Sequence, residues 1–121
     1  MIIVDTGIWV NHIKEPNPKL VSVAEGLEAL LHPYVLGELA LGSLPRRAWF
    51  LGRLAALPQP PVARPADLLQ LIDSQKLFST GIGYVDAHLL ASARLIPGAK
   101  LWTRDKRLHA QAERLGVSFA A

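Results

Sequence analysis

Apolar residues in this chain follow two spacings, which alternate along its length. The run Ile2-Ile3-Val4 is continuous and β-branched, which favours a strand covered on both faces. Other stretches repeat their apolar residues every three or four positions, as amphipathic helices do. The pattern predicts strands at 2–5, 28–31, 100–103 and 117–119, and helices at 6–13, 19–26, 34–41, 46–57, 65–77, 84–95 and 105–115.

Proline and glycine mark the ends of several predicted elements. Two prolines within residues 15–18 stop the first helix, and Pro33 and Gly42 bracket a later one, as helix termini prefer. Thr6 is predicted to cap the first helix. Because strands alternate with helices from end to end, we expect an α/β fold with a parallel sheet and a single domain at 1–121.

The composition fits a folded domain and excludes several classes of protein. Half of the 121 residues are hydrophobic, so the chain can bury a core. There is no cysteine, which excludes disulfides and thiolate metal sites and fits the reducing cytoplasm that we expect as its location. No apolar run reaches the roughly 18 residues of a membrane span. The net charge of +3 permits a polyanionic partner without requiring one.

Four of the ten acidic residues occupy positions that are unusual for solvated charges. Asp5 and Asp105 come directly after predicted strands, whereas Glu38 and Asp86 lie in helices beside apolar neighbours. The other six fit solvated helix faces, helix ends or turns: Glu15, Glu25, Glu28, Asp67, Asp73 and Glu113.

Carboxylates that converge away from water need a compensating cation, because like charges oppose joint ionisation. Mg²⁺ and Mn²⁺ prefer such hard oxygen ligands. Each position also has a simpler interpretation. Asp5 and Asp105 suit turns or helix caps, Asp86 suits the first turn of a helix, and Glu38 suits a solvated helix face. The four together, in the order Asp, Glu, Asp, Asp, favour a metal site.

Four sequence blocks resemble a PIN domain of the VapC toxin type. They are Val4-Asp5-Thr6-Gly7-Ile8-Trp9, the helical Glu38, Gly83-Tyr84-Val85-Asp86-Ala87, and Leu101-Trp102-Thr103-Arg104-Asp105-Lys106-Arg107-Leu108. They stand in the family's order and cover essentially the whole chain. The resemblance implies an α/β/α sandwich, with helices around a parallel sheet of four to five strands. It also implies a Mg²⁺- or Mn²⁺-dependent endoribonuclease, the toxin of a type II toxin–antitoxin system.

The resemblance assigns catalysis and metal binding to Asp5, Glu38, Asp86 and Asp105, and places Thr6 and Thr103 beside them. Two positions depart from the family pattern. Gly7 stands where a serine is common, and Lys106 follows Asp105 where some members carry a second acid. The implied partners are a VapB-type antitoxin and an RNA substrate. The implied assembly is a homodimer, or a heterotetramer or larger complex with the antitoxin.

The expected reaction is hydrolysis of an RNA phosphodiester bond. Asp5 and Asp86 would hold the metal directly, while Glu38 and Asp105 would bind through water or complete a second site. Two other classes stay open on the sequence: a non-catalytic nucleic-acid or protein-binding module on the same scaffold, and a metal-dependent phosphatase.

Basic and aromatic residues add two further expectations. Arg104, Lys106 and Arg107 would hold neighbouring phosphates, with a solvated helix start as the alternative. Trp49 or Phe50, in the segment 46–51, is predicted to pack in the core, with an antitoxin groove or a dimer contact as the alternative.

Overall fold

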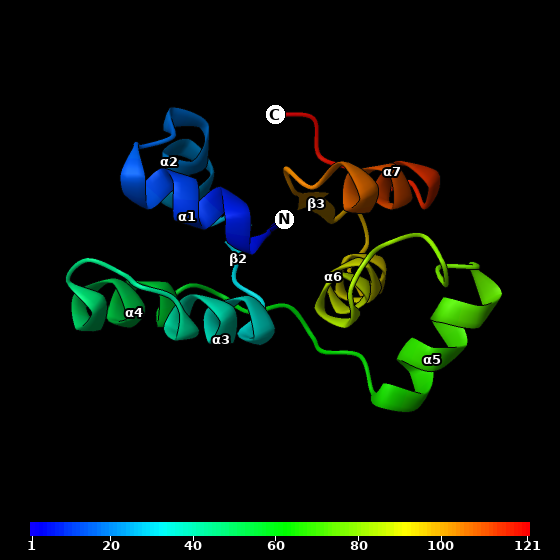
Figure 1. Cartoon of the computed structure of the whole chain (residues 1–121). Coiled ribbons are helices and arrows are strands. Elements are labelled where there is room, and N and C mark those ends of the chain that lie inside the picture. Colours follow the sequence, from blue (N-terminus) through cyan, green and yellow to red (C-terminus); the bar gives the residue numbers. More distant parts are fainter.

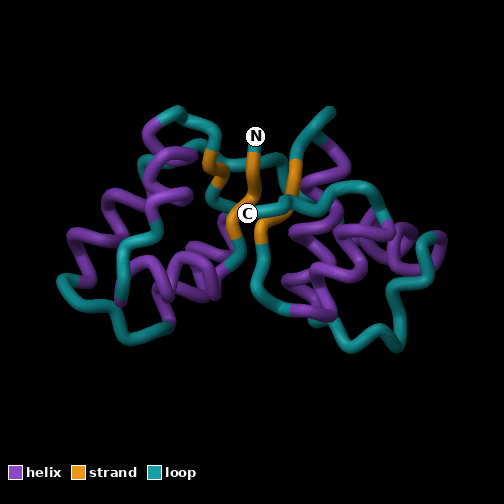
Figure 2. Tube along the Cα trace, turned by 90° about the horizontal axis from the view of Figure 1, so that it is seen from above, coloured by secondary structure: helices purple, strands orange, loops and turns teal.

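The computed structural model describes all 121 residues and places a three-stranded parallel sheet between two groups of helices (Figures 1 and 2). Strand β1 (Ile2–Val4) is central, with β2 (Ala29–Leu30) and β3 (Lys100–Trp102) at its sides. The helices are α1 (Thr6–Lys14), α2 (Pro18–Glu25), α3 (Pro33–Leu41), α4 (Arg47–Ala55), α5 (Pro65–Ser74), α6 (Tyr84–Leu95) and α7 (Lys106–Arg114). None of them is long and apolar enough to cross a membrane.

The register of β1 places the acidic end of the strand. All three β1 residues are buried, as the continuous apolar run predicts. Ile3 pairs with Leu101, and Val4 pairs with Trp102, in parallel. The chain therefore leaves β1 and β3 at the same edge of the sheet, and the Asp5 N–H donates to the Trp102 carbonyl at 2.9 Å. This pairing brings residues from the two ends of the sequence together.

Helix α6 is the most buried helix of the fold. Seven consecutive residues, Ala87–Ala93, are buried, so the helix is covered on every side. It packs against β1, β3 and α5. The buried Ser92 hydroxyl is satisfied because it donates to the Pro61 carbonyl at 2.7 Å. The start of this helix, which carries Asp86, is thereby held firmly beside the sheet.

The sheet has fewer strands than the predicted four to five. Residues 117–119, predicted as a strand, form one isolated parallel bridge in which Ser118 pairs with Leu101. The Leu101 N–H donates to the Val117 carbonyl at 2.7 Å, and the Phe119 N–H donates to the Leu101 carbonyl at 3.0 Å. The segment follows the edge of β3 for too short a distance to form a ladder.

Candidate active site

Asp5 stands at the junction of β1 and α1, and both of its carboxylate oxygens accept hydrogen bonds. The Thr6 N–H donates to Oδ1 at 2.7 Å, which makes Asp5 the N-cap of α1. The prediction that Thr6 caps this helix is wrong, because Thr6 is the first helical residue. The Thr103 hydroxyl, 98 residues away in sequence, donates to Oδ2 at 2.6 Å. Asp5 is thus oriented from two sides.

Glu38 reaches the same region from the middle of α3. The Thr6 hydroxyl donates to Glu38 Oε1, with 2.6 Å between the two oxygens. Helices α1 and α3 pack together, so this bond joins two neighbouring elements. Thr6 therefore links Asp5, through its backbone, to Glu38, through its side chain.

Asp86 and Asp105 lie at the starts of α6 and α7. The Gly83 N–H donates to Asp86 Oδ2 at 2.9 Å. Asp105 caps α7 by accepting from the N–H groups of Arg107 and Leu108 at 2.9 and 3.0 Å. The Asp105 N–H in turn donates to the Thr103 hydroxyl oxygen at 3.1 Å. Thr103 therefore bridges Asp5 and Asp105, and Asp105 has the helix-capping role that was the simpler interpretation of its position.

We call Asp5, Glu38, Asp86 and Asp105 the acidic centre, because their charges act on one another. Burial raises the pKa of the Asp5 carboxyl, the bonds from Thr103 and Thr6 oppose this, and the charges of Glu38 and Asp105 raise the pKa further. Burial also raises the pKa of Asp86, opposed by the Gly83 N–H and reinforced by Asp5 and Asp105. Burial and the neighbouring negative charges therefore disfavour the ionised forms of Asp5 and Asp86.

The acidic centre has the chemistry of a site for a hard divalent cation. No member forms an ion pair, since the salt bridges of the protein join Arg64 to Asp67 and His109 to Glu113. No three of these carboxylates form a preformed ligand cluster. Mg²⁺ usually keeps several waters and takes only one or two protein carboxylates, so its binding does not require a cluster of three. Burial is the main cause of the raised pKa values of Asp5 and Asp86, repulsion by neighbouring carboxylates adds to it, and a bound cation would favour the ionised forms.

Basic residues lie beside Asp105 without joining any carboxylate. Arg104 and Lys106 line an open hollow of about 450 Å³ that Thr103 and Phe119 also border. Arg107 crosses the backbone of Gly81, which has a positive φ of 86°. A Cβ on that glycine would lie 2.7 Å from the Arg107 Cδ and 3.0 Å from its Nη1. The missing side chain therefore leaves the space that the guanidinium occupies.

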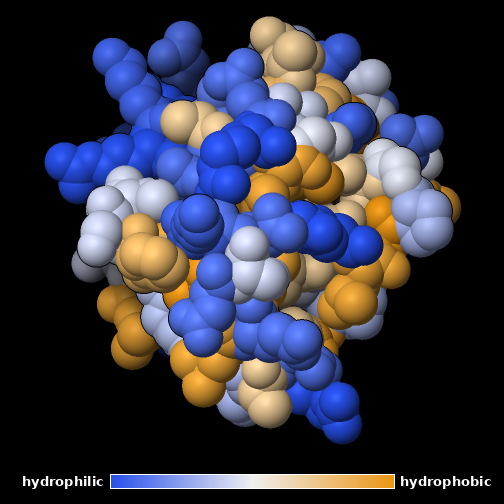
Figure 3. Space-filling model, turned by 90° about the vertical axis from the view of Figure 1, so that its right-hand side faces the viewer, coloured by the Kyte–Doolittle hydropathy of each residue, from blue (hydrophilic) through white to orange (hydrophobic).

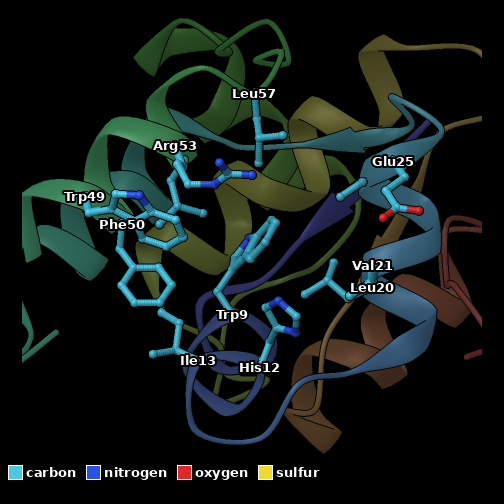
Figure 4. Close-up of a pocket in the computed structure, with 12 residues that line it drawn as sticks. Trp9, His12, Ile13, Leu20, Val21, Glu25, Trp49, Phe50, Arg53 and Leu57 are labelled. Atoms are coloured by element: carbon cyan, nitrogen blue, oxygen red, sulfur yellow. The ribbon is translucent and has the colours of Figure 1, made fainter. Parts of the chain in front are cut away.

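A separate apolar groove of about 320 Å³ runs between α1, α2 and α4 (Figure 4). Trp49 and Phe50 of α4 face Trp9 and Ile13 of α1 across it. Trp49 keeps 46% of its surface exposed and Phe50 is only partly buried, so the prediction that one of them packs in the core is wrong. Trp9, which lines this groove, is buried, and its Nε1 has no hydrogen-bond partner. The groove thus has a largely apolar wall.

The surface on the α5 and α7 side has a different character. Figure 3 shows it as a mosaic of hydrophilic and hydrophobic residues, with the hydrophilic ones spread over much of the face. The six acidic residues that were predicted to be solvated are all exposed, which confirms their assignment: Glu15, Glu25, Glu28, Asp67, Asp73 and Glu113.

A group of four rings next to the acidic centre was not predicted from the sequence: His32, Tyr34, Tyr84 and His88. His88 lies two residues after Asp86, on another face of the helix, and is buried away from the surface. The available signal was spacing. Tyr34 precedes Glu38 by one helical turn, and Tyr84 precedes His88 by one turn.

Comparison with known proteins identifies close relatives along the full length of the chain. The chain is 45% identical over 120 residues to a protein named Ribonuclease VapC32 from Mycobacterium tuberculosis, found in two strains. The match covers 99% of this chain and 97% of that relative. No family model matches the chain, and no solved structure matches it.

Proposed function

This chain belongs to the VapC family of ribonucleases, and from that membership we propose that it cleaves RNA phosphodiester bonds at the acidic centre with Mg²⁺ or Mn²⁺. It is a toxin endoribonuclease of the family, and the finer assignment of residues and metal is our proposal. One observation carries the assignment: four carboxylates interact at one edge of the sheet without a single cationic partner. Glu38 and Asp105 are exposed and Asp5 and Asp86 are partly buried, so water and a cation can reach the centre, whereas partly buried acids with a purely structural role would be expected to pair with Lys or Arg.

Asp5 and Asp86 are proposed to hold the ion directly, because both are partly buried and firmly oriented by hydrogen bonds. Glu38 and Asp105 would act through water or complete a second site. When bound, such an ion supplies positive charge for the phosphate and acidifies a water molecule for in-line attack. Thr103 keeps Asp5 and Asp105 in a fixed mutual orientation, because its hydroxyl donates to one and accepts from the other.

The proposed phosphate contacts are Arg104 and Arg107, with Thr6 and Thr103 beside them. Arg107 is free to bind phosphate because it forms no ion pair and its guanidinium rests against the backbone of Gly81. The Thr6 and Thr103 hydroxyl protons are already donated to Glu38 and Asp5. We therefore propose that the two threonines serve the substrate mainly by orienting carboxylates.

A VapB-type antitoxin is the proposed protein partner, and the apolar groove between α1, α2 and α4 is its proposed docking site. A helical or extended segment with apolar side chains would cover Trp49 and Phe50. We propose that the toxin pairs as a homodimer and enters a heterotetramer or larger complex in the cytoplasm.

The decisive experiment is cleavage of structured RNAs by the purified chain, free of antitoxin, with Mg²⁺ or Mn²⁺ and then with EDTA. Asp5→Asn and Asp86→Asn should each lower cleavage by at least about 100-fold, because several kcal/mol of charge stabilisation are lost. Both variants should fold, because an amide keeps the shape of the carboxylate and removes the repulsion.

Asp73→Asn is the matched control, since Asp73 is an exposed acid at the end of α5. It should cleave RNA at the rate of the unmodified chain. Cleavage that persists in EDTA, or in both centre variants, would contradict the proposed mechanism.

A further inference from the structure

Two tyrosines stand exposed at the edge of the acidic centre. Tyr34 and Tyr84 are 39% and 54% exposed. Tyr34 lies one helical turn before Glu38 on α3, and Tyr84 lies two residues before Asp86 in the first turn of α6. Each ring therefore lies within about one helical turn of a different carboxylate, and Tyr84 is on the face of α6 that carries His88.

Both tyrosine rings rest on one buried histidine. The ring centroids of Tyr34 and Tyr84 each lie 4.8 Å from that of His88, in edge-to-face geometry. The His32 ring lies 5.0 Å from that of Tyr34, also edge to face, and 6.2 Å from that of His88. Such aromatic contacts are geometrically specific, so the tyrosines are held as a pair.

The buried imidazoles have unsatisfied hydrogen-bonding groups. His88 is 1% exposed, and neither of its ring nitrogens has a partner; His32 is fully buried, and its Nε2 is also unpaired. A buried polar group without a partner costs stability, so its presence in a native fold calls for a reason. Nothing else in the packing uses these nitrogens. The two tyrosine rings that pack on His88 are exposed at the surface.

We propose that Tyr34 and Tyr84 form a stacking surface for unpaired RNA bases next to the cleaved bond, an inference that rests on the proposed function. Aromatic side chains bind single-stranded nucleic acid because every base presents a π-face, whatever its identity. A base in a duplex is already stacked, so this surface selects single-stranded segments. The acidic centre repels phosphates until a cation binds, and stacking supplies attraction that does not depend on charge.

A second copy of the chain is the competing occupant, and the site favours RNA. A contact between copies over this surface would bring Glu38 and Asp86 toward the same carboxylates of the other copy. Two tyrosines also supply far less area than the roughly 800 Å² per partner of a stable interface. A base on the tyrosines leaves the carboxylates open to a metal and to the adjoining phosphate.

The test measures RNA binding in the Asp5→Asn background, in EDTA, so that no cleavage intervenes. Labelled single-stranded RNA of about ten nucleotides is compared with an abasic strand of equal length and with a duplex. In Tyr84→Leu and Tyr34→Leu, the new side chain still packs on His88 but has no aromatic face. Each should weaken single-strand binding by about 5- to 150-fold. Tyr84→Phe should bind within about 2-fold of the parent.

Binding of the abasic strand should not change in any of these variants, because it has phosphates without bases. Leu95→Ala, at the far end of α6 with 55% exposure, is the surface control and should bind RNA as the parent does. Unchanged single-strand binding in both leucine variants, or an equal loss with the abasic strand, would overturn the proposal. A fall in molecular mass by light scattering in the leucine variants would also overturn it and assign the surface to a contact between copies.

The same variants separate this inference from the proposed function. Cleavage by the unmodified chain in Mg²⁺, with no effect of the tyrosine variants on binding, would sink the stacking surface alone. Loss of binding in the tyrosine variants, in a chain that does not cleave RNA with any divalent ion, would uphold the surface and overturn the proposed function.

Discussion

At the acidic centre, hydrogen bonds show that two threonines orient the carboxylates. Thr103 donates its proton to Asp5 and accepts from the Asp105 N–H, so one hydroxyl orients two acids. Thr6 does the same for Asp5 and Glu38 with its backbone and its hydroxyl. These bonds oppose the rise in the pKa of Asp5 that burial causes. The centre is therefore assembled by hydroxyl groups as much as by carboxylates.

Gly81 controls the place of Arg107, and a methyl group there tests the proposed phosphate contact. Gly81→Ala should push the guanidinium away, because the new Cβ would lie 2.7 Å from the Arg107 Cδ. We expect KM for RNA to rise several-fold, as in Arg107→Ala, with a loss of roughly 1 kcal/mol of stability from the positive φ. Steady-state cleavage and urea unfolding measure the two effects.

Gly98→Ala is the matched control, because Gly98 has a similar φ of 77° with no atom near its missing Cβ. It should lose similar stability and leave KM unchanged. The double variant Gly81→Ala/Arg107→Ala should have the KM of Arg107→Ala alone. Additive effects on KM would contradict a shared cause.

At the scale of elements, helices α1, α2 and α4 build the groove that the antitoxin is proposed to fill. The Trp49 ring is contacted by the guanidinium groups of Arg46 and Arg53, at 4.3 and 4.9 Å from its centroid. It also meets Phe50 edge to face at 4.9 Å. These neighbours hold an exposed indole in place on the wall of the groove.

Trp49→Ala should weaken antitoxin binding by at least about 10-fold, as expected when a central aromatic anchor is removed. The fold should survive, because the side chain is nearly half exposed. Titration calorimetry with the antitoxin measures the first effect and thermal unfolding the second. Leu41→Ala, 90% exposed at the end of α3 and outside the groove, should change neither. Failure of Trp49→Ala to fold would make Trp49 a core residue and refute the groove.

At the scale of the whole molecule, His32 and the carboxylates of Asp5 and Asp86 change the free energy of unfolding in opposite directions as pH falls. Burial, with a smaller effect of His88, lowers the pKa of His32 from 6.5 to about 4. The unfolded chain therefore binds this proton first, so the contribution of His32 to stability is complete above pH 6.5 and is lost toward pH 4. Asp5 and Asp86 have raised pKa values and act in the opposite direction, because their protonation relieves a penalty of folding.

His32→Asn isolates the histidine contribution, because asparagine can still accept the Tyr34 N–H at the start of α3. Between pH 7.5 and pH 4.5, in EDTA, the unmodified chain should lose up to about 3 kcal/mol more stability than the variant. Urea unfolding at the two pH values measures the difference. His109→Asn, on the surface of α7, should follow the unmodified chain. Parallel pH curves for the unmodified chain and His32→Asn would show that His32 does not titrate as its burial requires.

Much of this fold was predictable because its elements depend on neighbours in sequence. The β-branched run of β1 and the proline and glycine boundaries of α3 identified those elements, and α6 was predicted with the same bounds, 84–95. The four acids of the centre were likewise singled out by their local apolar contexts. The number of strands was overestimated because a short β-prone segment, 117–119, makes a ladder only where an edge strand accompanies it far enough.

By itself the sequence determined which residues carry charge, where the chain is stiff or apolar, and which short segments become helix or strand, since these depend on side-chain chemistry within a few residues. Only the tertiary structure decided that Thr103 bonds Asp5, that Trp49 faces a groove, and that Tyr34 and Tyr84 share His88. Those contacts join residues far apart along the chain. They depend on strand register and helix packing, which are set by the burial of the whole core.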